Sequence, residues 1–249
     1  MFAEGRQGLV RDQLVAWAQS DHRVTGAALT GSAAEGTDDR WSDVDLFFGV
    51  GQDATVDDVL LDWTSRIYEE LHAVHHFDLH GGGATYRAFL LDDGLEVDLG
   101  FTFSDHFGPL GSGAFNILFG AASPRLSGVP DVDHIIGLSW HHAMHARISI
   151  ERNAPWQAEH WISALRDHVV SLGSIRHGLP ELYAKGADQL PEEERALITK
   201  ALVTSLDGRE LARALSAAVR VLLEEIQHTD RQTTDKLRPL LESWAGVDR

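Results

Sequence analysis

The sequence predicts an α+β protein in which a mixed β-sheet flanked by helices is followed by an all-α helical bundle. Short β-branched and aromatic runs alternate with helical patterns in the first half of the chain. Residues 104–130 are rich in Gly, Ser and Pro and resemble a crossover. Beyond them every periodic segment is helical. We therefore expect a sheet domain over residues 1–125 and a helical domain over residues 130–249.

The first half shows both helical and extended periodicity. Helical spacing of apolar residues occurs over 5–19 and 55–74, and Thr55 or Asp57 could cap the second helix. A hairpin is expected around Asp93-Gly94, because Asp-Gly is a strong signal for a tight turn. The segments expected to be strands are 24–31, 44–50, 75–80, 85–91 and 95–103.

The second half reads as consecutive helices. Pro155 fits the first turn of a helix, whereas Pro180 and Pro191 mark breaks between helices. The segments expected to be helical are 133–150, 155–177, 192–205, 208–228 and 231–244.

Composition narrows the class of protein. Of the 249 residues 43% are hydrophobic and 24% charged, as in globular proteins with a well-formed core. No apolar run is long enough for a membrane span, and the charged, amphipathic N-terminus is unlike a signal peptide. Cysteine is absent, which excludes disulfides and thiolate metal sites and favours a cytoplasmic location.

The net charge of −17 disfavours nucleic acid as a partner, because phosphates would be repelled. It favours a cationic partner or substrate, although an acidic surface can also serve solubility alone.

Two aspartates, one residue apart, stand at the head of the strand expected at 44–50, within the segment TGSAAEGTDDRWSDVDLFF. In a strand, residues i and i+2 lie on one face about 6.7 Å apart, so Asp43 and Asp45 project together. Asp98 lies on another expected strand. If the two strands are neighbours, three carboxylates converge, and their repulsion calls for a hard cation such as Mg²⁺. Two such ions would form the clamp used in phosphoryl and nucleotidyl transfer.

The surroundings of this Asp-x-Asp distinguish it from a chance pair. The same tripeptide recurs as Asp131-Val132-Asp133, where it precedes a helix and Asp133 is the expected cap. Upstream of the first pair, Gly31 and Ser32 follow a strand. Glycine lets backbone N–H groups approach an anion, and a serine hydroxyl can donate to a phosphate oxygen.

These motifs resemble the signature of the DNA polymerase β-type nucleotidyltransferase superfamily, in which Gly-Ser and a short helical loop precede Asp-x-Asp on a strand. LEVDLGF (95–101) is similar to its third carboxylate strand. WQAEHWISALRDHV (156–169) and KGADQLP (185–191) resemble the small antibiotic-modifying branch, which includes aminoglycoside and lincosamide adenylyltransferases.

The resemblance implies a role for each matching residue. Gly31 and Ser32 would hold the triphosphate of ATP, and Asp43 and Asp45 would bind Mg²⁺. Asp98 would be a third metal ligand, the general base, or both. A substrate hydroxyl would attack the α-phosphorus of ATP and release pyrophosphate, and positioning and charge neutralisation do most of the work in such chemistry.

The sequence departs from this pattern at Glu35, where many relatives have Arg or Lys. An acid there removes a favourable charge near the phosphates unless Arg40 supplies it. Lys185, in the loop after a long helix, is the best candidate for a second cation, and an ordinary exposed loop lysine is the alternative.

Acceptor-binding residues are sought in the helical half. Glu159 and Asp167 fall near one helix face, where they could bind a cationic substrate or form a plain solvated surface. Glu159 could also replace Asp98 as the base. Trp156 could stack on an adenine or a sugar, or pack in the core. His141 and His145 have the spacing of helical zinc ligands, but core or interface roles fit them equally.

We therefore expect an enzyme, a cytoplasmic adenylyltransferase of two domains, monomeric or homodimeric, with its active site between the domains. It would move AMP from ATP to a hydroxyl of a small cationic acceptor such as an aminoglycoside, or a lincosamide. Two alternatives stay open, namely a nucleotide-binding or antitoxin-like module with little chemistry, and an enzyme that adenylylates proteins.

Overall fold

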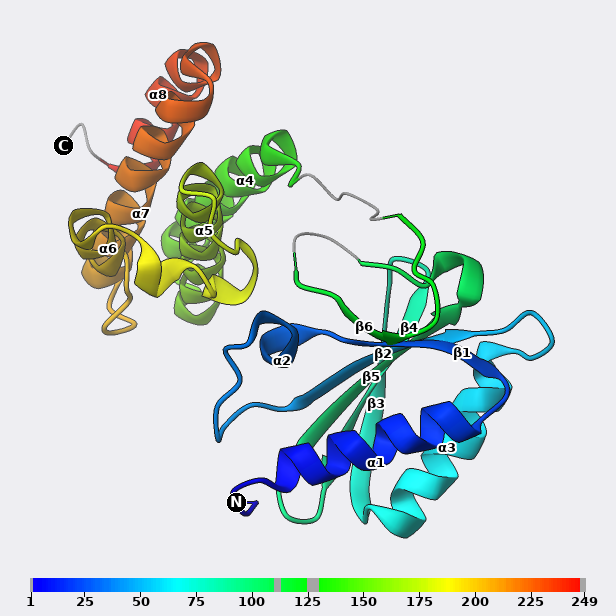
Figure 1. Ribbon diagram of the computed structural model, residues 1–249. Coiled ribbons are helices and arrows are strands. Elements are labelled where there is room, and N and C mark those ends of the chain that lie inside the picture. Colours follow the sequence, from blue (N-terminus) through cyan, green and yellow to red (C-terminus); the bar gives the residue numbers. More distant parts are fainter. Residues whose placement is uncertain (1, 110–112, 125–129, 247–249) are drawn as a thin grey trace. The chain divides into compact units, whose positions relative to one another are not determined.

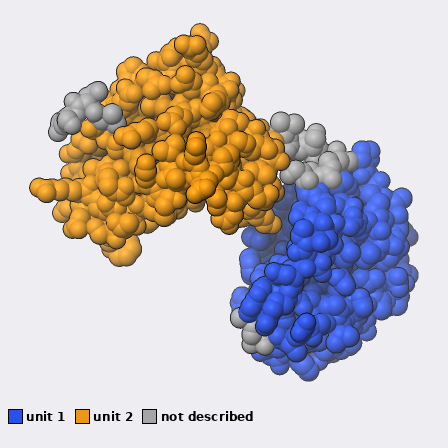
Figure 2. All heavy atoms as spheres, turned by 60° about the vertical axis from the view of Figure 1, so that its left-hand side comes forward, with its two compact units in different colours: residues 1–129 blue, residues 130–249 orange. Residues whose placement is uncertain are grey.

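The computed structural model describes residues 2–109, 113–124 and 130–246 (Figure 1). The chain divides into two compact units, residues 1–129 and 130–249, shown in blue and orange in Figure 2. Part of the Gly-, Ser- and Pro-rich segment, residues 110–112 and 125–129, lies outside the described residues.

Unit 1 is built on a mixed six-stranded sheet with the order β3-β4-β5-β2-β1-β6. β2 and β5 pair in parallel, and the remaining neighbours are antiparallel. The predicted α+β class is thus confirmed, with a mixed sheet followed by a helical second half. The strands are β1 (Val24–Leu29), β2 (Val44–Val50), β3 (Ala73–Gly81), β4 (Ala84–Leu91), β5 (Glu96–Phe103) and β6 (Asn116–Phe119).

Two helices, α1 (Arg6–Ser20) and α3 (Val56–Glu70), cover the same face of the sheet (Figure 1). The buried side chains of α1 and α3 form one core with alternate residues of the central strands, such as Phe48 of β2 and Phe101 of β5. Because side chains alternate along a strand, the intervening residues of β2 and β5 point to the opposite face.

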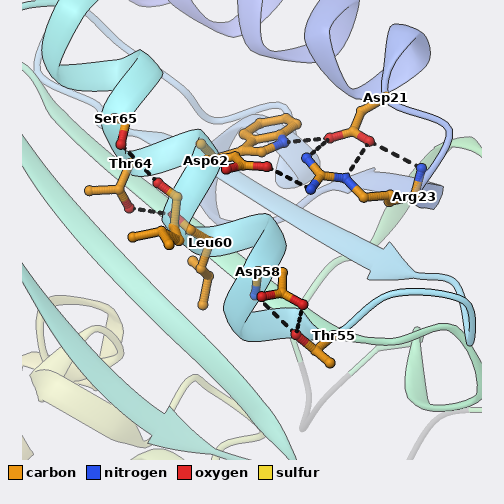
Figure 3. Close-up of polar contacts among 10 residues, drawn as sticks. Asp21, Arg23, Thr55, Asp58, Leu60, Asp62, Thr64 and Ser65 are labelled. Atoms are coloured by element: carbon orange, nitrogen blue, oxygen red, sulfur yellow. Dashed lines mark hydrogen bonds and ion pairs between the residues drawn. The ribbon is translucent and has the colours of Figure 1, made fainter.

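A polar cluster fixes the start of β1 against α3 (Figure 3). Asp21 accepts hydrogen bonds from Arg23 Nε and Nη2, each 2.9 Å long, and from Trp63 Nε1 at 3.0 Å. Arg23 also donates to Asp62 at 2.7 Å. At the start of α3 the hydroxyl of Thr55 accepts from the Asp58 N–H, so Thr55 is the cap.

The face opposite α1 and α3 carries a smaller aromatic core. Phe47 of β2 stacks on Phe107 with ring centroids 6.1 Å apart, and Phe107 follows the 3₁₀ turn η1 (Ser104–His106). β6 was not predicted. This strand of four residues pairs with β1 at the sheet edge, and it lies in the stretch that the sequence presents as a crossover.

Unit 2 is helical. Its buried side chains form one core across α4, α5, α7 and α8. Two 3₁₀ turns, η2 (Leu182–Ala184) and η3 (Ala187–Gln189), follow α5. No helix within the described residues has both the length and the apolar character that a membrane span needs. The helices are α4 (Val132–Glu151), α5 (Pro155–Arg176), α6 (Glu192–Thr199), α7 (Gly208–Thr229) and α8 (Arg231–Ala245).

Two details of unit 2 differ from expectation. α6 ends at Thr199 and not at 205. The guanidinium of Arg213 in α7 donates hydrogen bonds to the carbonyls of Lys200 and Leu202, so these carbonyls have acceptor roles outside a continued helix. The cap of α4 is Asp131, whose carboxylate accepts from the His134 N–H at 2.9 Å, and Asp133 lies in the first turn.

Candidate active site

The central parallel pair of strands brings two of the three predicted carboxylates together. Asp45 of β2 and Asp98 of β5 are register partners. Adjacent strands lie about 4.8 Å apart, so the two side chains leave neighbouring backbones on the same face. This is the face opposite α1 and α3, because the residues that flank Asp45 and Asp98 belong to the core beneath those helices.

The third carboxylate, Asp43, lies one residue before β2 and is exposed. Burial raises the pKa of Asp98 to about 6, and the negative charges of Asp43 and Glu96 add to the shift. Asp98 Oδ1 is buried and has no hydrogen-bond partner among the described residues. A buried carboxylate oxygen without a donor beside other acids fits a cation and disfavours a purely structural role.

Gly31 opens the short helix α2 (Gly31–Glu35) directly against Asp45. Its φ of +58° lies in the left-handed region, and a Cβ there would overlap the carboxylate of Asp45. The Thr30 N–H donates to the Asp45 carbonyl at 3.3 Å, which holds the turn against β2. Ser32 follows on the same half-buried turn. Glycine is needed here both for its conformation and for the close approach.

A hollow of about 340 Å³ lies beside the loop before β2. Asp43, Asp45 and Arg40 line it, together with Arg11 from α1. The guanidinium of Arg40 lies 4.2 Å from the ring centroid of Trp41. The hollow thus combines two of the predicted carboxylates with two cations.

α1 supplies a brace for this loop that sequence reasoning missed. Gln7 Nε2 donates to the carbonyls of Asp39 and Ser42, at 3.3 and 3.1 Å. Gln7 and Arg11 both line the hollow, and both lie on one helix face because they are four residues apart. That spacing was the available signal, but nothing in the sequence tied α1 to the loop.

Tyr86 of β4 is a second residue that the sequence did not single out. Burial and the charge of Asp98 raise the pKa of the Tyr86 hydroxyl to about 12. Its ring lies 5.7 Å from that of Phe47, centroid to centroid, and both rings pack over Gly100. The Tyr86 hydroxyl therefore stays protonated at neutral pH, and the negative charge of Asp98 further disfavours its ionisation.

The remaining predicted site residues belong to unit 2. Glu159 accepts from the Ser163 hydroxyl at 2.7 Å, and Asp167 pairs with Arg166 at 3.3 Å. Trp156 is 75% exposed, so the expectation that it packs in the core is wrong. Lys185 is exposed and directly follows η2.

Histidines gather around Trp161 in unit 2. The rings of His141 and His145 lie 4.3 Å apart, and His142 stacks on His168 at 4.9 Å. Burial and the neighbouring imidazoles lower the pKa of His142 to about 4.

Within residues 2–109, 113–124 and 130–246, no three His, Asp or Glu side chains are placed to hold a metal ion as they stand. Joint binding of Mg²⁺ by Asp43, Asp45 and Asp98 thus requires their carboxylates to turn toward a shared point.

No family model matches the chain, and no curated protein matches its sequence. Among solved structures it is similar to the crystal structure of an aminoglycoside 6-adenyltransferase from Bacillus subtilis. The TM-score is 0.43 and the identity 12%, with 98% of this chain and 99% of that chain covered.

Proposed function

We propose that the protein is a Mg²⁺-dependent nucleotidyltransferase that moves AMP from ATP to a hydroxyl group of a small acceptor. The observation that carries the proposal is the parallel register that pairs Asp45 with Asp98. Asp43 lies two residues from Asp45 on the sequence, and its charge acts on Asp98. Asp45 also packs against Gly31 so closely that a side chain has no room there, which supports a role for this turn in the same site.

Asp43, Asp45 and Asp98 are the residues that would hold one or two Mg²⁺ ions. When bound, the metal neutralises phosphate charge and orients the phosphates for in-line attack. The chain's own contribution is placement, since two adjacent strands fix the backbones from which the carboxylates project. Such positioning and charge complementarity account for most of the catalysis in phosphoryl transfer.

In the transfer step, the acceptor oxygen forms a bond to the α-phosphorus while the bond from that phosphorus to the bridging oxygen breaks. Pyrophosphate leaves with the electron pair, and the acceptor hydroxyl gives up its proton. We propose that Asp98 accepts that proton. Its pKa of about 6 leaves the carboxylate ionised at neutral pH while making it a stronger base than an ordinary aspartate.

The triphosphate would lie against the turn at Gly31 and Ser32, where backbone N–H groups can approach an anion. Arg40 lines the same hollow as Asp43 and Asp45, which supports its role as the cation that compensates for Glu35. Lys185 is proposed as the cation from unit 2. Glu159, Asp167 and Trp156 are proposed to contact the acceptor, and Trp156 has the exposed indole that stacking needs.

An acceptor screen tests the proposal. The protein is incubated with Mg²⁺ and ATP labelled at the α-phosphate, together with aminoglycosides, lincosamides and simpler amino alcohols. We expect pyrophosphate release and a product heavier by one AMP group, detected by mass spectrometry. ATP binding without any release would favour a nucleotide-binding module, and label in lysate proteins would favour protein adenylylation.

A further inference from the structure

The open face of the sheet next to Asp98 is apolar. The register places Phe77 opposite Ala88, and Ala88 opposite Asp98, across β3, β4 and β5. One step along the strands, Leu90 lies opposite Glu96. Phe77 is 50% and Leu90 47% exposed, so two large apolar side chains lie open to solvent beside the half-buried Asp98.

These residues form a hollow of about 310 Å³. Its walls include Phe77, Ala88 and Leu90, with His75 and Glu96 at its polar margin. Ala88 and Asp98 are direct cross-strand partners, with Cα atoms about 5 Å apart, so the hollow borders the proposed catalytic carboxylate. Its volume lies at the lower end of the range for small-molecule sites.

The charge of the hollow has one sign. Glu96 is exposed, and it lies two residues from Asp98 on the same face of β5, about 6.7 Å along the strand. Among the residues that the structure describes, no Lys or Arg lines the hollow. A ligand that complements this hollow has a cationic group to pair with Glu96 and an apolar group to contact Phe77 and Leu90.

We propose that this hollow is an acceptor subsite of the enzyme and takes the amphipathic amine part of the acceptor, namely an apolar ring with one ammonium group and a hydroxyl. Any further part of the acceptor is left for Glu159, Asp167 and Trp156. The inference rests on the proposed function and refines its substrate class. The ring lies on Phe77 and Leu90, the ammonium faces Glu96, and the hydroxyl points to Asp98. The spacing of the two carboxylates along β5 favours an acceptor whose nitrogen and hydroxyl oxygen are about 6 to 7 Å apart.

Binding is tested first, without nucleotide. Three probes separate the contributions, namely 2-phenylethylamine, ethylamine without the ring, and 2-phenylethanol without the charge. Titration followed by NMR should show the tightest binding for 2-phenylethylamine. Phe77→Ser should weaken it about fivefold through lost apolar contact. Glu96→Gln should weaken it roughly threefold and leave 2-phenylethanol unchanged.

Matched controls come from α3, on the other face of the sheet. Leu61 is 66% exposed and Glu69 is exposed, so Leu61→Ser and Glu69→Gln make the same chemical changes away from the hollow. Both should leave the affinities unchanged. Equal affinity for 2-phenylethylamine in the wild type, Phe77→Ser and Glu96→Gln would overturn the subsite.

A transfer assay separates this inference from the proposed function. Labelled ATP is offered with 4-(aminomethyl)cyclohexanol or with glucosamine, a hydrophilic ring that also bears an amine and hydroxyls. Preference for the cyclohexanol, lost in Phe77→Ser, supports the subsite. Transfer to glucosamine alone, undiminished in Phe77→Ser, overturns the subsite but leaves the function standing. Binding that depends on Phe77 and Glu96, without AMP transfer to any acceptor, supports the subsite and counts against the function.

Discussion

Asp45 and Asp98 stand side by side as register partners on the two parallel strands at the centre of the sheet. Both side chains point away from the layer of α1 and α3, and Asp98 has a buried oxygen without a donor among the described residues. Among the described strands, the β2–β5 pairing is the one parallel junction, and the predictions on AMP transfer and Mg²⁺ rest on its pair of acids.

Replacing Asp45 or Asp43 by Asn should abolish AMP transfer, with a loss of about 10²-fold or more, because charge on the phosphates would no longer be balanced. Turnover measured by pyrophosphate release checks this. Asp133→Asn is the matched control, since it changes the same tripeptide where it begins α4. Comparable losses in all three variants would point to a general effect on folding.

Gly31→Ala should impair the site far more than Gly36→Ala. Both glycines have positive φ, +58° and +69°, so both substitutions carry a similar backbone cost of about 1 kcal/mol. Only at Gly31 does the new Cβ overlap Asp45, whereas the space around Gly36 is open. Calorimetric titration with an ATP analogue and Mg²⁺ should therefore show weaker binding for Gly31→Ala alone. Equal affinities would remove Gly31 from the site.

Mg²⁺ affinity should rise with pH between about 5 and 7 and then level off. The pKa of Asp98 is about 6, so below that pH a proton competes with the metal for the carboxylate. Isothermal titration of chelator-treated protein at several pH values gives the profile. Asp98→Asn should bind more weakly with a flat profile over this range, and an unchanged slope would mean that another group titrates.

The Asp21 cluster should stabilise unit 1 in a pH-dependent manner. Hydrogen bonds from Arg23 hold the pKa of Asp21 at about 2, below its ordinary value of 3.8. A lowered pKa means that the stabilisation is present above about pH 4 and is lost as pH falls toward 2. Asp21→Asn should cost roughly 2 kcal/mol of unfolding free energy at pH 7, and progressively less in acid.

Asp62→Asn serves as the control for that measurement. Asp62 pairs with the same Arg23, but its side chain is 63% exposed, against 14% for Asp21. Its replacement should cost less than about 1 kcal/mol. Urea denaturation of the three proteins from pH 7 to pH 3 gives the comparison, and similar costs for both variants would contradict the role of burial.

Local patterns predicted the elements well. The strand expected at 44–50 coincides with β2, because its continuous β-branched and aromatic run is bounded by a polar loop and a glycine. The helix expected at 155–177 matches α5 within a residue, since proline at the first turn and a buried apolar stripe define it. Asp45 and Asp98 can lie close together only if β2 and β5 are neighbours. The sequence alone does not determine which strands are neighbours, so the convergence of the carboxylates was predicted only on that condition.

Features that depend on tertiary pairing escaped prediction. β6 owes its existence to β1, because four residues have too little local preference to declare a strand. Tyr86 had no motif around it, and its relation to Asp98 comes from the register of β4 with β5. Gln7 binds a loop that lies far from it in sequence. In each of these three cases a segment distant in the sequence determines the structure, and the local sequence pattern does not.

The parallel pairing of β2 with β5 also bears on how the protein folds. The chain must pass through α3, β3 and β4 before β5 can join β2. Among the pairs formed by strands β1 to β5, this pair therefore joins the residues that lie furthest apart in the sequence. Contacts between residues far apart in the sequence form slowly, because the chain loses the entropy of closing the intervening loop before the contacts contribute to stability. A nascent or partly unfolded chain that has formed helices and the β3–β4 hairpin would therefore still lack the paired carboxylates of the candidate site.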